Sequence, residues 1–494
     1  MRFRPSPTMT LAFDSSLLLN LSTLAIVAIV GLVFRLTLAV SAEYRRRQSI
    51  RNIPGPSSSS WLFGNLLQMQ IPWEYGQIDL EWLKKYGAVY RIKGGLGRDR
   101  LIVADHAAIQ AIVYGEDFER TPAREAIVAW LFDDRGLMAH HGQAHRHLRG
   151  ALNTGFTATA VRSYQSTFET LAETLCTTLD GIVSQTKGGA VVNLSPLLNT
   201  VTLSAISQAA LGCPVEDLNP ALVRNNSELL ELSSTLAAGQ ILVDEILNLG
   251  FVPKWLLDLA IKYPVGQALK TMHAQRYLSV EQGREIMAKQ LKTADAVGSV
   301  DEVDHVYGKI LHSEILGNSE NKISLEDLVH QTSIILVAGQ DTSAIMLGWL
   351  FIALSQRPAL QDALRGEILS QAKDDAYDHC PLLNAIIKET IRLWPALPLM
   401  FHQAKRDTIL PLSTSFKGVD GEEIKAIPIL KGQMVTVSTY AYEHLESRWG
   451  KDADEFNPYR WLDGSVPQGS ALGPYANLLG FWAGPHHCLG WRFA

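Results

Sequence analysis

The stretch Phe481–Gly490, with the sequence FWAGPHHCLG, carries the strongest chemical signal in this chain. Glycine lacks a Cβ and permits tight backbone turns, and Gly484 and Gly490 stand on either side of Cys488. We therefore expect a compact loop whose backbone N–H groups point at the cysteine sulfur, with Phe481 covering it. Hydrogen bonds of this kind hold a thiolate beside a metal and tune its electron donation. A cysteine in such a setting is otherwise more often an ordinary thiol than a ligand.

A second motif lies on a predicted helix that contains Lys388–Arg392, with the sequence KETIR. Glu389 and Arg392 are three residues apart, so they share one face of that helix. An isolated pair of this kind is usually a surface ion pair of little energetic value. Further along the chain, Phe456–Trp461 reads FNPYRW and adds Arg460.

A third motif, Ala338–Ser343 (AGQDTS), interrupts a long apolar helical stretch. Glycine inside a helix costs about 1 kcal/mol relative to alanine, and an acid and a hydroxyl suit an apolar face poorly. One interpretation is close helix packing, with Thr342 bonding back to a backbone carbonyl. The alternative is a local widening of the helix around Gly339, with Asp341 and Thr342 directing protons to a bound oxygen molecule.

Taken together, these motifs resemble those of the cytochrome P-450 superfamily: FxxGxxxCxG, ExxR, FxPxRW and AGxDT[ST]. The resemblance runs from the proline-rich segment near residue 54 to the last residue. It implies that the Cys488 thiolate is the axial ligand of a haem b iron, and thiolate donation to iron favours O–O bond cleavage. It further implies catalytic roles for Gly339, Asp341 and Thr342, and structural roles for Glu389, Arg392 and Arg460.

The resemblance also implies donors for the haem propionates. Arg149 is retained from the family's WxxxR helix, whereas His145 replaces the tryptophan. His402 and His486 stand where arginine is commoner. A neutral histidine donates one hydrogen bond and carries no fixed charge, which predicts weaker or pH-dependent haem retention. The alternative is that the propionates raise the histidine pKa, so that histidine serves as well as arginine.

Composition limits the classes of protein to which the chain can belong. The 494 residues are 47% hydrophobic and 19% charged, which excludes a disordered chain. The net charge of −6 argues against non-specific nucleic-acid binding. The four cysteines are scattered and form no CxxC pair, so we interpret them as thiols in a reducing compartment. A non-haem metal site at His141 and His145 is disfavoured because the glutamate of an HExxH motif is missing.

Hydrophobic periodicity predicts a mainly α fold with a small β region. The resemblance to the cytochrome P-450 superfamily implies that this is a single large haem domain. Ser195 is the expected N-cap of one helix, with Pro196 at its first position. Gly94–Gly97 is interpreted as a hairpin turn and not as a phosphate-binding loop. The expected helices are 163–183, 195–211, 227–249, 274–291, 325–354 and 382–394, and the expected strands are 89–92, 100–103 and 434–438.

The apolar run from Leu17 to Val40 predicts a transmembrane anchor, since about 20 apolar residues span a bilayer. A cleaved signal peptide is the alternative, but its apolar core is typically about 7–15 residues long. Arginines that follow the run place the downstream side in the cytosol. We predict a short lumenal segment at residues 1–16, an anchor at 17–40, a basic and proline-rich hinge at 41–60, and a haem domain at 61–494. The location implied is the endoplasmic reticulum membrane, crossed once, with the catalytic domain cytosolic.

The resemblance implies a substrate pocket lined by Phe118–Leu137, Val337–Thr342 and Ala396–Phe401. These stretches are apolar and aromatic, so a lipophilic substrate is expected. Leu249–Leu259 is similar to the apolar loop through which microsomal members touch membrane lipid, although an amphipathic core helix would look the same. The residues named as pocket lining are Ile127, Val128, Trp130, Leu131, Phe132, Leu397, Leu399, Met400 and Phe401.

The predicted function is a haem-thiolate monooxygenase that inserts one oxygen atom of O2 into a lipophilic small molecule. Similarity to fungal members suggests a secondary metabolite such as a terpenoid, and electrons would come from NADPH through a separate NADPH–P-450 reductase. The chain ends six residues beyond Cys488. The alternative is therefore a truncated, catalytically silent haem- or ligand-binding protein or a non-functional fragment. A haem-thiolate isomerase or dehydratase is disfavoured because Asp341 and Thr342 are retained.

Overall fold

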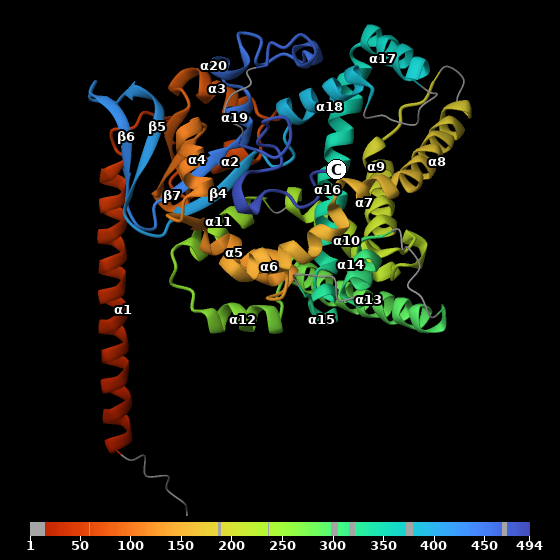
Figure 1. The fold of residues 1–494 in the computed structure, drawn as a ribbon. Coiled ribbons are helices and arrows are strands. Elements are labelled where there is room, and N and C mark those ends of the chain that lie inside the picture. The colour runs from red at the N-terminus through yellow and green to blue at the C-terminus, as the bar shows by residue number, and fades with distance from the viewer. Residues whose placement is uncertain are drawn as a thin grey trace, which may run out of the picture.

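The computed structural model describes residues 15–58, 60–185, 189–235, 237–297, 305–315, 322–371, 379–466 and 472–494. It confirms a mainly α protein with a small β region. Figure 1 shows the strands gathered on one side of the body and the long helices on the other, with helix α16 (Thr332–Ser355) running through the helical side. A second long helix, α1 (Ser15–Ser49), projects away from the body.

Five strands form the main sheet in the order β1-β2-β7-β4-β3. β2 and β7 are parallel, and the other neighbours are antiparallel. The predicted hairpin turn at Gly94–Gly97 joins β1 to β2, which pair antiparallel as expected. A separate two-stranded sheet contains β5 and β6. The strands are β1 Val89–Lys93, β2 Asp99–Val103, β3 Phe118–Arg120, β4 Leu399–Ala404, β5 Thr408–Lys417, β6 Glu423–Ile429 and β7 Met434–Ser438.

Each predicted helical segment coincides with one or more helices. One start signal was wrong: α9 begins at Leu194, and Asn193 Oδ1 accepts a hydrogen bond from the Ser195 N–H at 3.2 Å, so Asn193 is the cap. The remaining helices are α2 Leu66–Gln70, α3 Gln77–Tyr86, α4 His106–Tyr114, α5 Pro122–Phe132, α6 Gly142–Asn153, α7 Ala158–Ser163, α8 Gln165–Ser184, α9 Leu194–Ile206, α10 Pro220–Thr235, α11 Ala237–Asn248, α12 Lys254–Lys262, α13 Gln267–Val297, α14 Val306–Ile315, α15 Leu325–Val329, α17 Pro358–Gln371, α18 Pro381–Leu393, α19 Thr439–Glu443 and α20 Glu446–Trp449.

Helix α16 lies inside the helical half of the molecule and packs against α9, α13 and α18. Among the described residues, Leu325–Ser355 is the one helical stretch long and apolar enough to cross a membrane. In this structure 22% of the most apolar window of that stretch is buried inside the protein.

The segment at residues 41–60, expected to be a hinge, is built into the domain. Ile50 and Ile53 are buried in the core beside the sheets. The Arg91 N–H donates to the Pro54 carbonyl at 2.9 Å, and Arg46 Nε donates to the Lys431 carbonyl at 2.7 Å. Proline and serine indicate a turn without indicating whether the turn is packed against the domain.

Candidate active site

The Cys488 loop has the compact geometry expected from its glycines. Gly484 has φ +66°, and a Cβ there would lie 2.8 Å from Val113 Cγ1 and 2.9 Å from the Val113 carbonyl oxygen. Only glycine fits this close approach to α4. The Cys488 N–H donates to the Phe481 carbonyl at 2.8 Å, which closes the loop.

The Cys488 thiol is accessible to solvent, although protein atoms surround it, so it lies in a recess. Burial raises the pKa of the thiol, while the Gly490 N–H and the charge of Arg149 act to lower that pKa. The prediction that a backbone N–H points at the sulfur is thus met by Gly490. A hydrogen-bonded thiol beside a guanidinium is well placed to become a metal-bound thiolate.

The histidines predicted from the propionate positions lie close to this loop. His145 of α6 is buried, and its ring centroid is 4.2 Å from that of His486. The pKa of both imidazoles is lowered to about 4, chiefly by burial, and the charge of Arg149 acts in the same direction. Both rings are therefore neutral at pH 7, and the fixed positive charge of this cluster comes from arginine.

Strands β3 and β4 bring two more side chains to the same region. His402 of β4 stacks on Trp482, with ring centroids 5.5 Å apart, and its buried Nδ1 has no hydrogen-bond partner among the described residues. Burial lowers the pKa of His402 to about 4, and the backbone of Met400 acts in the opposite sense. Its neighbour in the antiparallel register is Arg120.

Sequence reasoning missed Arg120. Its charge lowers the pKa of His145, His402 and His486, which places the guanidinium near all three. Arg120 Nε donates to Glu125 Oε1 at 2.8 Å. The available signal was a cation directly before the Thr121-Pro122 helix start, but nothing in the sequence shows that β3 pairs with β4.

The Glu389 motif forms a buried polar network, as predicted for a structural element. Arg392 Nε and Nη2 donate to the two Glu389 carboxylate oxygens at 2.9 and 2.8 Å. Arg460 Nε donates to Glu389 Oε1 at 3.0 Å, and Trp461 Nε1 donates to Oε2 at 2.9 Å. Both arginines and Glu389 are buried, and Asp452 supplies the second carboxylate, 2.9 Å from Arg460 Nη2.

Comparison with known proteins agrees with this geometry. The family model described as Cytochrome P450 matches residues 54–494. The chain belongs to the cytochrome P450 family. One similar curated protein is the fungal cytochrome P450 monooxygenase 205 of Postia placenta, which is 28% identical over 90% of this chain and 83% of its own length. Another is cytochrome P450 monooxygenase claP of Ampulloclitocybe clavipes, which is 28% identical over 91% of this chain and 84% of its own length. Cytochrome P450 monooxygenase 219 of Postia placenta is also 28% identical, over 92% of this chain and 86% of its own length.

The family binds a haem through a cysteine thiolate, and the residues of this P450 fit that group. Cys488 offers a soft sulfur ligand, Arg149 and Arg120 offer fixed positive charge, and the unpaired Nδ1 of His402 offers a polar partner. The sulfur of Cys488 suits an iron ligand, and the two arginines and the unpaired nitrogen of His402 suit the carboxylates at the edge of a haem.

The AGQDTS motif of this P450 is packed against α9. A Cβ on Gly339 would lie 2.5 Å from Ile206 Cγ1, and Thr342 Oγ1 donates to the Ala338 carbonyl at 2.8 Å. Helix α16 is uninterrupted from Thr332 to Ser355, so the predicted widening is not seen. Close packing accounts for Gly339, while burial raises the pKa of Asp341.

Helix α5 divides the expected substrate lining between two faces. Val128, Leu131 and Phe132 pack with Ile334 and Val337, next to the AGQDTS motif. Trp130, in contrast, lies in a separate cluster with Leu247 and residues of α12 and α13. The apolar residues expected from this stretch therefore do not all face the same way, because neighbouring positions on a helix point in different directions.

The other cysteines show no sign of a ligand role. All four cysteines are free thiols; Cys176 is exposed, Cys213 half-buried and Cys380 buried at the start of α18. Among the described residues, no group of three or more His, Cys, Asp or Glu side chains has the arrangement of a metal site. Cys488 thus differs from the other three in its surroundings, because it alone lies beside Arg149 and the histidine cluster.

Proposed function

We propose that this P450 monooxygenase inserts one oxygen atom of O2 into a lipophilic small molecule, with electrons supplied from NADPH by a separate NADPH–P450 reductase. The observation that carries the proposal is the Cys488 loop, which is closed by the Cys488 N–H···O=C Phe481 hydrogen bond and lies near enough to Arg149 for that charge to lower the pKa of the thiol. Bound there, a thiolate-ligated haem supplies the electron donation that favours O–O cleavage.

Each surrounding side chain has a distinct part in this proposal. Cys488 holds the iron of haem b, and the carbonyl of Phe481 fixes the Cys488 backbone. Arg149 and Arg120 pair with the propionates, and His145, His402 and His486 contribute hydrogen bonds as neutral rings. Gly339 allows α16 to approach α9 closely and so sets the position of the next two residues.

Asp341 and Thr342 are proposed to deliver protons. Burial raises the pKa of Asp341, so its carboxyl group holds a proton at higher pH than an exposed aspartate does. The Thr342 hydroxyl donates to Ala338 in this structure and can rotate to accept a proton at Oγ1. The pair therefore supplies a donor and a relay at adjacent positions of α16.

The proposed substrate is lipophilic, and a fungal secondary metabolite such as a terpenoid fits the apolar wall. Val128, Leu131 and Phe132 form that wall on the α5 face toward α16. Apolar walls bind hydrocarbon skeletons by burying their surface and discriminate poorly between one lipophilic molecule and another. The wall therefore supports a class of substrate and not one compound.

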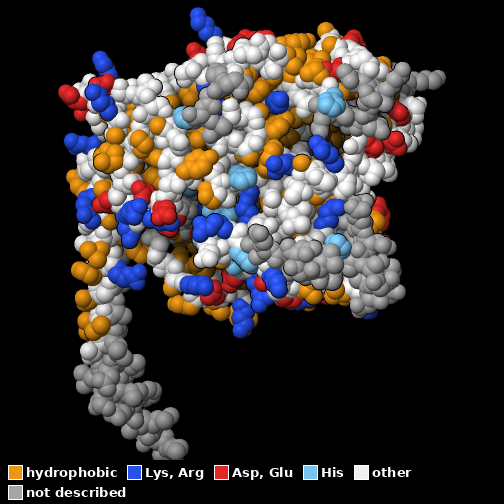
Figure 2. All heavy atoms as spheres, in the orientation of Figure 1, with side chains coloured by type: hydrophobic (Ala, Val, Ile, Leu, Met, Phe, Trp, Pro, Cys, Tyr) orange, Lys and Arg blue, Asp and Glu red, His pale blue; other side chains and the backbone are white. Residues whose placement is uncertain are grey.

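We further propose that the protein is anchored once in the endoplasmic reticulum membrane by residues 17–40, with residues 1–16 lumenal and the domain from residue 61 cytosolic. The described part of helix α1 exposes apolar side chains (Figure 2), and Ile26, Val27 and Phe34 are each at least 60% exposed. Helix α12 also exposes Trp255 and Leu259, and Figure 1 places it on the side of the body toward which α1 extends. One lipid surface could therefore contact both helices.

Reduction under carbon monoxide tests the proposal. The wild-type protein should give the Soret band of a thiolate-ligated haem, and Cys488→Ser should lose it while keeping the far-UV circular dichroism of the wild type. Cys176→Ser is the matched control, because Cys176 is an exposed thiol on α8. A histidine-type band in the wild type, or an unchanged band in Cys488→Ser, would overturn the proposal. Product formation with reductase and NADPH then separates an oxygenase from a silent haem protein.

A further inference from the structure

A series of buried amide side chains connects three helices to the AGQDTS motif. Asn225 and Asn226 belong to α10, Gln275 belongs to α13, and Gln340 belongs to α16. None of the four is more than 8% exposed. Helix α13 packs against both α10 and α16, so the series lies inside the helical half of the molecule (Figure 1). The function proposed above gives Gln340 no role.

The four amides are joined by consecutive hydrogen bonds. Asn225 Nδ2 donates to Gln275 Oε1 at 2.9 Å, and Gln275 Nε2 donates to Asn226 Oδ1 at 3.0 Å. Asn226 Nδ2 in turn donates to Gln340 Oε1. At the other end, Asn225 Nδ2 also donates to the Thr271 carbonyl at 3.1 Å. The series therefore runs from the backbone of α13 to the motif on α16.

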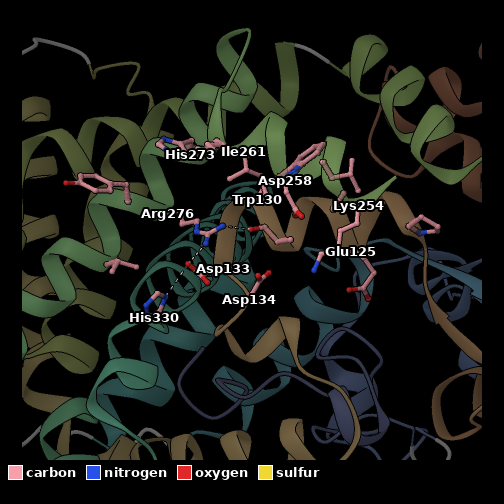
Figure 3. Close-up of a pocket in the computed structure, with 17 residues that line it drawn as sticks. Glu125, Trp130, Asp133, Asp134, Lys254, Asp258, Ile261, His273, Arg276 and His330 are labelled. Carbon is pink, nitrogen blue, oxygen red and sulfur yellow. Dashed lines mark hydrogen bonds and ion pairs between the residues drawn. The ribbon is translucent and has the colours of Figure 1, made fainter. Parts of the chain in front are cut away.

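Helix α13 is itself held in place next to this series. Arg276, the neighbour of Gln275, forms an ion pair with Asp133 at 2.5 Å, and His330 Nδ1 lies 3.3 Å from the same carboxylate. Figure 3 shows Arg276 and His330 converging on Asp133 at the end of α5. These contacts fix α13, so Gln275 has a defined position from which to hold α10 and, through Asn226, α16.

Gln340 lies on the side of α16 opposite to the proposed proton relay. An α-helix turns about 100° per residue, so Gln340 is about 160° around the helix axis from both Ala338 and Thr342. Gln340 is 2% exposed, whereas Ala338 is exposed and Thr342 is half-buried. The amide series therefore holds the packed side of α16 and leaves the side that carries Thr342 less covered.

Amides hold a helix in a way that apolar side chains do not. Replacing both partners of a hydrogen bond by apolar groups of the same shape costs little stability, so stability alone does not require amides at these positions. Hydrogen bonds depend on direction, whereas hydrophobic contacts do not. A bonded amide series consequently fixes the rotation of α16 about its axis as well as its distance from α10 and α13.

The same helices also contribute to the proposed substrate wall. Leu229 of α10 and Met272 of α13 pack against the apolar cluster of α5 described above. Leu229 follows Asn226 by three residues, so the two share a face of α10. Met272 precedes Gln275 by three residues and shares a face of α13 with it. The amide series thus joins the substrate wall and the motif in one packed unit.

We propose that Gln340 is a positioning residue, through which the amide series sets the rotation of α16 and so the direction in which Asp341 and Thr342 point. Proton transfer requires hydrogen-bond reach, and a misplacement of about 1 Å can lower a rate about 100-fold. The proposal rests on the monooxygenase function proposed above. It adds a residue that acts through its two neighbours and not by contact with the substrate.

Amide hydrogen exchange on the full-length protein as purified, without NADPH, tests the positioning directly. Gln340→Leu keeps a side chain of similar size and leaves Asn226 Nδ2 without its acceptor. Exchange across residues 337–343 should become about 3- to 10-fold faster, which corresponds to one lost buried hydrogen bond. Unchanged exchange would overturn the proposal.

Gln282→Leu is the matched control for this measurement. Gln282 is a buried amide of the same helix as Gln275, and its Oε1 accepts from the N–H of Asn219, the residue before α10, at 2.6 Å. The control variant therefore loses a bond between α13 and α10 and should leave exchange at residues 337–343 at the wild-type value. Equal acceleration in the two variants would also overturn the proposal.

A double-mutant cycle with Thr342 separates positioning from general destabilisation. Gln340→Leu should lower the product formed per NADPH about 3- to 10-fold, and Gln282→Leu should keep the wild-type ratio. In the Thr342→Ala background, Gln340→Leu should lower the ratio by less than about 2-fold, because the relay that it positions is already impaired. Losses that multiply independently would show that Gln340 does not act through Thr342.

The combined variant Asn226→Leu/Gln340→Leu separates positioning from stability. It removes both partners of one hydrogen bond, so the thermal midpoint should return to within a few degrees of the wild-type value. The product formed per NADPH should stay low, because the directional bond is still missing. A wild-type ratio in this variant would assign the amides to stability alone.

The outcomes remain separable from those of the proposed function. If exchange at residues 337–343 is unchanged in Gln340→Leu, the positioning role is refuted even when the thiolate-type band and product are present. If exchange responds as expected while no thiolate-type band forms, the monooxygenase proposal fails and the fixing of α16 by Gln340 stands.

Discussion

Glu389 and Arg392 form a bidentate ion pair within the core, with nitrogen–oxygen distances of 2.9 and 2.8 Å and both side chains fully buried. Arg392 Nη1 also donates to the carbonyls of Glu443 and Ala453, each at 2.7 Å. The pair therefore links α18 to the chain on both sides of α20. Its carboxylate accepts from Arg460 as well, and Arg460 also pairs with Asp452 at 2.9 Å, so two carboxylates compensate the two cations.

Glu389→Gln should lower the free energy of unfolding by about 3–5 kcal/mol, because it leaves the fully buried Arg392 guanidinium without a carboxylate, whereas Arg460 keeps its pairing with Asp452. Denaturant unfolding followed by circular dichroism measures the change. Asp362→Asn is the matched control, since Asp362 pairs with Arg365 at the same i, i+3 spacing but on the exposed surface of α17. The control should stay within about 0.5 kcal/mol of the wild type. Equal effects at the two sites would contradict the assigned role of burial.

Deletion at the N-terminus should separate the projecting part of α1 from the docked part. Removing residues 1–40 should leave the thermal midpoint of the domain within a few degrees of the full-length value. Removing residues 1–53 deletes Ile50 and Ile53 from the core and should cost about 2–5 kcal/mol for each lost side chain. Thermal unfolding of the two purified products measures the difference. If the two truncated proteins were equally stable, residues 41–53 would act as a hinge and would not contribute to the core.

Arg149 should be required for haem retention, whereas its neighbour on the same helix should not. Arg149 lies beside Cys488, and Arg146 of α6 is exposed. We expect Arg149→Gln to release haem about 10-fold faster in transfer to apomyoglobin, since charge-assisted pairs are worth roughly twice a neutral hydrogen bond. Arg146→Gln should match the wild type. Identical release rates for the two variants would place the propionates elsewhere.

Thr342→Ala should separate electron consumption from product formation. The proposed proton relay fails without the hydroxyl, so the product formed per NADPH should fall about 10-fold or more. Thr200 of α9 is a matched control, because its hydroxyl also bonds back to a carbonyl four residues earlier, at 2.9 Å. Thr200→Ala should keep the wild-type ratio. Full coupling in Thr342→Ala would assign the residue to packing alone.

His444 predicts a loss of stability in acid. It is buried on the ring of Tyr440, and burial lowers its pKa from 6.5 to about 4. The unfolded chain therefore binds a proton at His444 more tightly than the folded chain does. The free energy of unfolding is highest above pH 6.5 and decreases as the pH falls toward 4. Between pH 7.5 and pH 5, His444 should lower the free energy of unfolding by about 2 kcal/mol. Urea unfolding at both pH values measures the loss, and His444→Gln should reduce it by that amount; an unchanged loss would contradict the assignment.

Local patterns were enough to predict most elements and the motifs of the site. Helical periodicity identified α8, α13 and α18, and the glycines around Cys488 predicted a tight loop, because these features depend on residues adjacent in the chain. The N-cap of α9 was misassigned by two residues, since Asn193 and Ser195 are both good caps and local geometry chooses between them.

Where distant segments meet depends on the tertiary structure. The sequence alone determined that Cys488 stands in a tight glycine-flanked loop and that Glu389 and Arg392 share a helix face. Only the fold decided that Arg120 reaches the histidine cluster, that Ile50 and Ile53 join the core, and that Trp130 turns away from the substrate wall. The physical reason is that strand pairing and helix rotation are fixed by packing across the whole domain, and a single helix or strand does not encode its partner.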